Sequence, residues 1–341
     1  MSASQKSWYR RKRIVIPTAF LAAGLAVVAV SVVSPWPTSL LIRGMFDKGA
    51  ADTVAEMDPY VPDGVASQPD VEYATQGADT TLDVFYPDGT TSPQATVIWI
   101  HGGAWISGDK TSVNPYAQMI AAEGYTAVTV NYTVSPEAVY PVALEQLNSA
   151  LGYLVDNADE LNIDPNRIVI AGDSAGAQLT SQLANLATNP EFATEMGIAP
   201  QIDQSQLVGV ILNCGIYDVS GVADAPGIGA WGLGLALWSY LGDRDWSHTT
   251  GASQMSSVAH VTADFPATWI SGGNGDPLTD TQSKPLAEKL TFLGVPVTEV
   301  FYAADHTPEL PHEYQFHLDY PDAQTALQST LEFLSARTQL E

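Results

Sequence analysis

Short apolar runs alternate with longer amphipathic segments from about residue 70 to the end of the chain. The runs at 95–100, 126–130 and 168–171 consist almost entirely of apolar and β-branched residues, as in parallel strands buried on both faces. The segments at 140–162 and 175–189 instead place their apolar residues at helical spacing. A repeated strand–helix–strand order favours right-handed crossovers, with helices on both faces of one sheet. The sequence therefore predicts an α/β fold with a mostly parallel central sheet flanked by helices.

Two regions depart from this order. TLDVFYP at 81–87 alternates apolar and polar residues, so we expect it to pair antiparallel with VEYAT at 71–75 across a turn. Residues 220–266 carry three tryptophans among glycines and small residues and contain no clear strand. We interpret this stretch as a helical cap insertion over the strand ends, and its segment at 227–242 is expected to line or cover an apolar acyl pocket.

A serine stands between two glycines where a strand-like run meets a helical segment. RIVIA at 167–171 leads directly into GDSAG at 172–176. In G-x-S-x-G at such a junction the serine lies on a sharp turn, and a side chain at Gly172 or Gly176 would collide with the neighbouring strand or helix. The turn exposes the hydroxyl of Ser174 at the C-terminal edge of the sheet, near the positive end of the helix. The motif predicts a nucleophilic serine.

A serine nucleophile in acyl transfer needs hydrogen-bond donors for the oxyanion that forms. The buried run at 95–100 ends in HGGAW at 101–105, whose glycines allow an unusual loop. We expect the backbone N–H groups of Gly103, Ala104 and Ala175 to form the oxyanion hole. Taken alone, HGGAW would be interpreted as a tight turn, and its position upstream of GDSAG favours the catalytic interpretation.

These motifs resemble those of the α/β-hydrolases, and more narrowly the hormone-sensitive-lipase-like and carboxylesterase-type esterases. The resemblance rests on HGGAW at 101–105, DPNRI at 164–168, GDSAG at 172–176 and G-x-x-D-P-L at 273–278. It implies an α/β-hydrolase catalytic domain over residues 65–341 and a serine hydrolase that cleaves small-molecule carboxylic esters through an acyl-enzyme. No metal and no organic cofactor is implied.

The family's order of catalytic residues is serine, then acid, then histidine. Asp276 matches the acid, because it follows a predicted strand within G-x-x-D-P-L. In this role it would orient the histidine and stabilise the imidazolium. Asp280 is the nearby competitor, but it falls at the start of the next helix and is interpreted as an N-terminal cap.

The histidine is where the sequence departs from the family's pattern. Most relatives place His-Gly-Phe a few residues after the last strand, whereas the segment at 301–320 offers three histidines. His306 has the usual spacing from the strand, while His312 has the better spacing from the final helix and is followed by an aromatic residue two positions on. We expect His312 to be the base, on a lengthened loop, with His306 as the alternative. His317 is expected to lie on the surface or to pack, and His101 to brace its own loop.

Other functions are compatible with the same residues. An amidase, peptidase or formamidase would use the same serine, histidine and aspartate. A non-catalytic cell-surface module would be expected to lack one of the three, and a candidate for each is present. Cys214 lies in an apolar run and is interpreted as a packing residue rather than a nucleophile. We therefore expect an esterase or lipase.

Charge is distributed unevenly along the chain. The formal net charge is −25, and five of the 13 basic residues lie within residues 1–13, so the remainder is more acidic still. Such a surface argues against nucleic acid as a partner. Residues 14–33 are uncharged and long enough to cross a bilayer as a helix, and the basic residues before them would stay in the cytoplasm.

The N-terminal segment therefore predicts a membrane-anchored or exported protein. We expect residues 14–33 to be an uncleaved transmembrane signal anchor, with a signal peptide cut after the weak site at 29–31 as the alternative. Residues 34–64 would form a juxtamembrane segment, with Trp36 suited to the level of the headgroups. The catalytic domain would then lie outside the cytoplasm, either anchored to the membrane or secreted.

Overall fold

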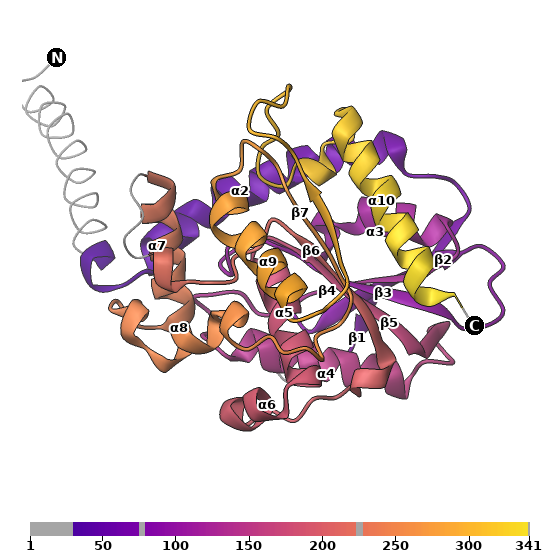
Figure 1. The fold of residues 1–341 in the computed structure, drawn as a ribbon, viewed down its shortest axis with the longest axis horizontal. Helices are drawn as coiled ribbons and strands as arrows, with labels where there is room; N and C mark the ends of the chain where they lie inside the picture. The colour runs from indigo at the N-terminus through magenta and orange to yellow at the C-terminus, as the bar shows by residue number, and fades with distance from the viewer. Residues whose placement is uncertain (1–29, 75–78, 223–227, 340–341) are drawn as a thin grey trace, which may run out of the picture.

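The computed structural model describes residues 30–74, 79–222 and 228–339. Eight strands of this part of the chain form one sheet in the order β1-β2-β4-β3-β5-β6-β7-β8 (Figure 1). β2 is antiparallel to β1 and to β4, and every other neighbouring pair is parallel. The strands are β1 (Val65–Glu72), β2 (Thr81–Pro87), β3 (Gln94–Ile100), β4 (Thr126–Val130), β5 (Ile163–Asp173), β6 (Leu207–Asn213), β7 (Thr268–Gly272) and β8 (Val297–Phe301).

The antiparallel pair predicted at the start of the sheet is present, but β1 begins six residues earlier than VEYAT. The pairing of β1 with β2 shifts register between Gln68 and Val71. Asp70 lies in this irregularity with φ of 54°, and its N–H donates to Oδ1 of Asp83 at 2.8 Å. A bulge of this kind breaks the alternation of side chains, so the first half of β1 has no recognisable strand pattern.

Helices cover both faces of the sheet. α4 (Val142–Asp156), α5 (Ala175–Thr188) and α9 (Lys284–Phe292) pack on one face, while α3 (Asn114–Ala122) and α10 (Pro321–Thr338) pack on the other. Successive side chains of a strand point to opposite faces, so Ile98 of β3 joins the first core and Trp99 joins the second. This arrangement explains why the central strands are apolar throughout, and it confirms the predicted α/β architecture.

The insertion at 220–266 is helical in its described part, which contains α7 (Ile228–Leu241) and α8 (Thr250–Met255) and no strand. Tyr240 of α7 stacks on Trp105 of the HGGAW loop, with ring centroids 5.4 Å apart and an interplanar angle of 8°. The insertion thus packs against the loop that follows β3. Its role in an acyl pocket stays a prediction.

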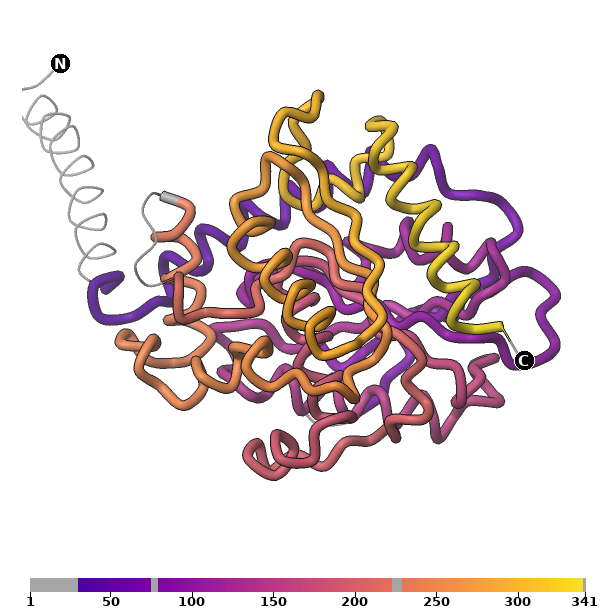
Figure 2. Tube along the Cα trace, in the orientation of Figure 1, coloured from indigo at the N-terminus to yellow at the C-terminus, as the bar shows by residue number. Residues whose placement is uncertain are grey.

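A long helix, α2 (Trp36–Met57), occupies most of the segment expected to be juxtamembrane. It runs along one side of the domain and contacts α7 and α3 (Figure 2). The guanidinium of Arg43 donates to the carbonyl oxygens of Ile106 and Ser135, both at 2.6 Å, and pairs with Glu137. Met57, the last residue of α2, is completely buried. α2 is therefore part of the domain's packing.

Among the described residues, no helix has both the length and the apolar character that crossing a bilayer requires. The basic segment 1–13 and most of the predicted transmembrane segment 14–33 lie outside the described residues.

Candidate active site

Ser174 lies on the sharp turn between β5 and α5. Its φ of 49° and ψ of −116° are strained for a residue with a side chain, and its N–H donates to the carbonyl oxygen of Asn213 at 2.8 Å. A Cβ on Gly172 would lie 2.5 Å from the carbonyl of Gly176, and a Cβ on Gly176 would overlap the carbonyl oxygen of Ile100. The backbone of the turn thus leaves no room for a side chain at either glycine.

A continuous chain of hydrogen bonds joins Ser174, His312 and Asp276. Nε2 of His312 lies 3.0 Å from Oγ of Ser174, and Nδ1 of His312 lies 2.8 Å from Oδ2 of Asp276. An ionised carboxylate only accepts hydrogen bonds, so Nδ1 of His312 carries a proton and the neutral ring offers Nε2 as an acceptor to the serine hydroxyl. Oδ1 of Asp276 accepts from the N–H of Leu278 at 2.9 Å, which fixes the carboxylate.

The loop between β8 and α10 carries His312 to the serine. Asn274, in the turn after β7, clamps this loop: its Nδ2 donates to the carbonyl oxygen of His306 at 3.0 Å, and its Oδ1 accepts from the N–H of Leu310 at 2.9 Å. The N–H of Gly275 donates to the carbonyl oxygen of Leu310 at 2.9 Å. The turn that holds the acid therefore also holds the loop of the base.

The two other histidines of the 301–320 segment contact acidic residues away from Ser174. Nε2 of His306 lies 3.1 Å from Oδ2 of Asp322, at the start of α10. Nδ1 of His317 lies 2.7 Å from Oε2 of Glu56 on α2. The structure therefore brings His312, and not the alternative base His306, to Ser174.

The predicted capping role of Asp280 is wrong. Asp280 lies inside a single π-helical turn at Thr279–Ser283, and its exposed carboxylate pairs with Lys284 at 2.6 Å. The helix already begins at Pro277, three residues before Asp280, and the carboxylate at its start is that of Asp276, which accepts from the N–H of Leu278.

The HGGAW loop has three consecutive residues at positive φ, namely Gly103 at 103°, Ala104 at 51° and Trp105 at 59°. A Cβ on Gly103 would lie 2.6 Å from the carbonyl carbon of Ser107, so glycine is required there. No described residue accepts a hydrogen bond from the N–H of Gly103 or Ala104. These N–H groups remain available to a ligand, and Ala175 begins α5 directly after the serine.

Asp173 ties this loop to the serine turn. Its buried carboxylate accepts from the N–H of Gly102 at 2.7 Å and from Nε1 of Trp99 at 2.8 Å. His101 is buried and stacks on Tyr132, with ring centroids 4.4 Å apart, and its Nδ1 lies 2.9 Å from the carbonyl oxygen of Gly102. Burial lowers the pKa of His101, so the ring is neutral. These contacts fit the bracing role predicted for His101.

Besides Asp276, a second carboxylate, that of Glu313, lies close to the base. Oε1 of Glu313 is 3.8 Å from Nε2 of His312. Burial acts to lower the pKa of His312, but its interactions with Cys214 and with Asp276, together with the charge of Glu313, outweigh burial and hold this pKa well above its ordinary value. Burial, followed by the charge of Glu313, raises the pKa of Asp173 to about 8.

Cys214 lies just beyond the end of β6 rather than within the strand, with φ of 43°. Its sulfur, a carboxylate oxygen of Asp276 and a ring nitrogen of His312 lie within 4.8 Å of one another. Burial raises the pKa of Cys214 to about 11, so it is a neutral thiol at pH 7. The hydrogen bonds of His312 already account for both of its ring nitrogens, so this set of three donors is explained without a metal ion.

Sequence reasoning missed three residues of this site. Asp173 stands inside the GDSAG motif, and Glu313 directly follows the base, so both could have been considered from their positions. The proximity of Glu313 to the base depends on the αL backbone conformation of Glu313, at φ of 58°. The sequence does not signal this conformation in a residue other than glycine or asparagine. Arg43 lies about 60 residues before the loop that it binds and carries no motif.

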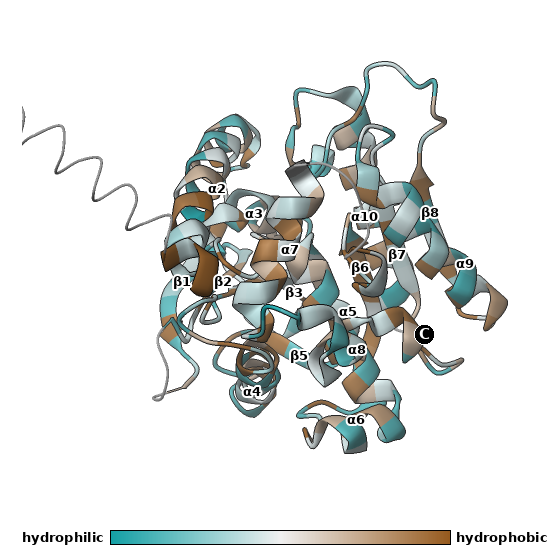
Figure 3. Cartoon of the chain, turned by 90° about the vertical axis from the view of Figure 1, so that its left-hand side faces the viewer, coloured by the Kyte–Doolittle hydropathy of each residue, from teal (hydrophilic) through white to brown (hydrophobic). Residues whose placement is uncertain are grey.

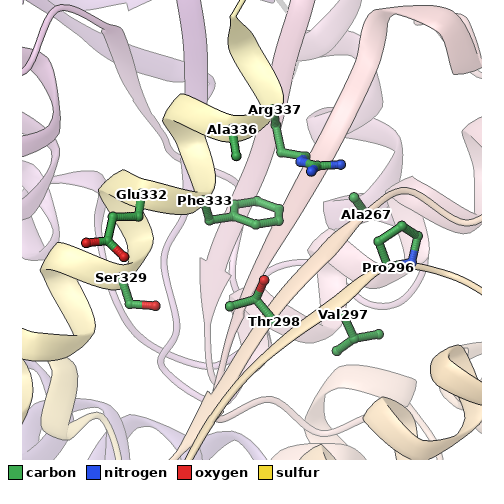
Figure 4. Close-up of a pocket in the computed structure, with 9 residues that line it drawn as sticks. All are labelled: Ala267, Pro296, Val297, Thr298, Ser329, Glu332, Phe333, Ala336 and Arg337. Carbon is green, nitrogen blue, oxygen red and sulfur yellow. The ribbon is translucent and has the colours of Figure 1, made fainter.

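A hollow of about 260 Å³ lies between α10 and the starts of β7 and β8 (Figure 4). Phe333 and Arg337 of α10 and Thr298 of β8 are among its lining residues, and no member of the Ser174 cluster is. Ligands of open α/β sheets bind beyond the carboxyl ends of the strands, whereas this hollow lies at their amino ends. It is therefore separate from the candidate active site.

A serine on a strained turn after a central parallel strand, with an acid after β7 and a histidine after β8, defines an α/β-hydrolase. Solved structures share this fold. An inhibited esterase B from Lactobacillus rhamnosis superposes with a TM-score of 0.76 at 22% identity, over 88% of this chain and 96% of its own. A bacterial heroin esterase gives 0.67 at 23% identity, over 87% and 91%.

The chain belongs to the BD-FAE family, whose model matches residues 82–290. Among curated proteins it is similar to the carboxylesterase NlhH of Mycobacterium tuberculosis, with 29% identity over 264 residues that cover 75% of this chain and 79% of the relative. It is also similar to the esterase LipI of the same organism, with 28% identity over 62% of this chain and 63% of the relative.

Proposed function

We propose that this protein is a carboxylic ester hydrolase with Ser174 as nucleophile, His312 as general base and Asp276 as the acid that orients it. The observation that carries the proposal is the hydrogen-bond chain from the serine hydroxyl through both ring nitrogens to the buried carboxylate. The similarity to a carboxylesterase and an esterase supports an ester as the substrate.

The reaction proceeds in two halves. Neutral His312 takes the proton of the Ser174 hydroxyl as the oxygen attacks the ester carbonyl. The N–H groups of Gly103, Ala104 and Ala175 stabilise the tetrahedral oxyanion, and the imidazolium then protonates the departing alcohol. Water, deprotonated by the same histidine, attacks the acyl-enzyme and releases the acid and the free serine.

The test is hydrolysis of p-nitrophenyl esters from acetate to palmitate by the full chain in detergent. We expect Ser174→Ala and His312→Ala to lose activity and His306→Ala, a matched control on the same loop, to retain it. Loss of activity in His306→Ala alone would reassign the base. An active Ser174→Ala enzyme would contradict the nucleophile, and cleavage of anilides without cleavage of esters would favour an amidase.

We further propose that residues 14–33 anchor the protein in a membrane, with the domain on the side opposite the basic residues 10–13. The uncharged run and its basic flank support this arrangement. The full chain is then expected to stay with membranes after alkaline carbonate extraction, and external protease is expected to digest the domain in intact spheroplasts. Release by carbonate, or an N-terminus that begins after residue 31, would instead support a cleaved signal peptide.

A further inference from the structure

The N-terminal part of α2, together with the residues just before it, exposes an unusual amount of apolar surface. The exposed positions between residues 30 and 46 are all apolar residues or glycine. The most exposed side chains are those of Val33 at 76%, Met45 at 68% and Leu41 at 67%. Single exposed apolar residues are ordinary on protein surfaces, but a contiguous group marks a place where something binds.

Several of these side chains form a stripe along one side of the helix. Residues four positions apart are neighbours on a helix surface, so Trp36 lies beside Leu40, and Leu41 beside Met45. We call Trp36, Leu40, Leu41 and Met45 the apolar stripe. Its length from Trp36 to Met45 is about 14 Å at helical rise.

The stripe has a polar border. One turn beyond Met45 the same side of α2 carries Lys48, and another turn on it carries Asp52, which pair at 2.6 Å and are both well exposed. Figure 3 shows the change from brown to teal along α2, with α7 beside it. Trp231 of α7 is also exposed, at 59%. An apolar surface that stops abruptly at charged residues, with tryptophan near it, has the character of a helix lying at a membrane interface.

The opposite side of α2 faces the domain. Ser39 is completely buried, and Arg43 donates to the carbonyl oxygens of Ile106 and Ser135. These bonds fix the rotation of the helix, so the stripe cannot turn inward. It is held outward even though burying it would be favourable.

We propose that the apolar stripe rests on the surface of a lipid bilayer, which seats the domain against the membrane. The chain that precedes it supports this occupant, because the uncharged segment 14–33 leads directly into the stripe. The inference rests on the membrane anchor proposed above. It adds that the domain lies against the membrane rather than at the end of a flexible linker. Because Arg43 joins the loop after β3 to α2, that loop then lies about one helix diameter from the lipid.

The test uses the full chain in vesicles of phosphatidylcholine and phosphatidylglycerol. A nitrobenzoxadiazole label is placed at Leu41→Cys and, as controls, at Asp52→Cys on the same side of α2 and at Phe292→Cys, a remote apolar residue that is 89% exposed. Cys214 is buried, and the unsubstituted chain provides the labelling blank. Quenching is measured with lipid-borne nitroxide and with aqueous iodide, and vesicle flotation of the unlabelled chain reports the anchor separately.

We expect lipid nitroxide to quench the Leu41 label at least severalfold more than either control label, and iodide to quench it less. A Leu41 label that iodide quenches as strongly as the Phe292 label, in a chain that floats, would overturn the stripe and leave the anchor standing. A label shielded from both quenchers would mean that protein covers the stripe, from residues 1–29 or a second copy, and would also overturn it. A chain that does not float would contradict both proposals.

Discussion

The carboxylate of Glu313, so close to the ring of the base, bears directly on the pH dependence of the reaction. The base works only when His312 is neutral, so kcat/KM falls as the pH drops through the pKa of His312. Because that pKa is raised, the acid limb is expected above the pH of 6.5 that is usual for histidine.

Glu313→Gln removes one of the charges that favour the imidazolium. We expect its acid limb to move to lower pH, while the rate on the alkaline plateau stays close to that of the unsubstituted enzyme. The measurement is the pH profile of kcat/KM for a neutral ester. An acid limb that does not move would show that Glu313 has no electrostatic influence on the base.

Asp276 is a second residue whose role is testable alone. Asp276→Asn preserves the shape of the side chain but presents an amide to Nδ1 of His312, which favours the wrong tautomer. In a triad this costs about 10⁴-fold in kcat. Asp280→Asn is the matched control, because Asp280 is exposed and pairs only with Lys284, and it is expected to leave kcat unchanged. Comparable losses in both variants would point to general damage to the loop.

At the scale of elements, the turn between β5 and α5 depends on the absence of two side chains. Gly176→Ala places a methyl group against backbone carbonyls of the β3 end, which cannot move aside as a side chain would. We expect a loss of stability of about 1–3 kcal/mol or more, together with loss of activity.

Gly49→Ala on α2 is the control for this substitution. Nothing lies within 4 Å of a Cβ at Gly49, and alanine is the better helix former by about 1 kcal/mol. Urea unfolding should therefore show the two variants moving in opposite directions. Equal midpoints would mean that the turn relaxes around the methyl group.

The elements that could be predicted from the sequence are those whose patterns are local. The central strands are apolar on both faces, and the GDSAG turn shows its glycines directly, so the fold and the place of Ser174 follow from the residues. The geometry at His312 also agrees with the spacing argument that preferred it to His306. α2 was not predicted, because the prolines at 35 and 37 look like helix breakers, whereas at the first turn proline is tolerated.

The whole molecule carries a net charge of −25, and this is expected to influence which esters reach Ser174. An ester with a carboxylate on its acyl chain is repelled by the protein's field, so its kcat/KM should lie below that of a neutral ester of equal length. Raising the ionic strength from about 0.1 M to about 1 M shortens the Debye length from about 10 Å to about 3 Å.

The salt dependence of the two substrates separates this effect from pocket shape. With added salt we expect kcat/KM for the anionic ester to rise and that for the neutral ester to change little. An equal response of both substrates would show that the field does not reach the approaching ester, and that any preference comes from contacts inside the site.

The bonds made by Arg43 have a practical consequence for producing the catalytic domain in soluble form. A truncated chain that starts at Val65 keeps every described strand, yet it loses the donor to Ile106 and Ser135, the Glu56 partner of His317, and the buried side chain of Met57. Its HGGAW loop would keep the contacts of Asp173 and Tyr240 but lose the support of α2. A start site near residue 34 removes the transmembrane candidate and retains all of these contacts, at the expense of leaving the apolar stripe in water, where mild detergent would be needed to prevent aggregation.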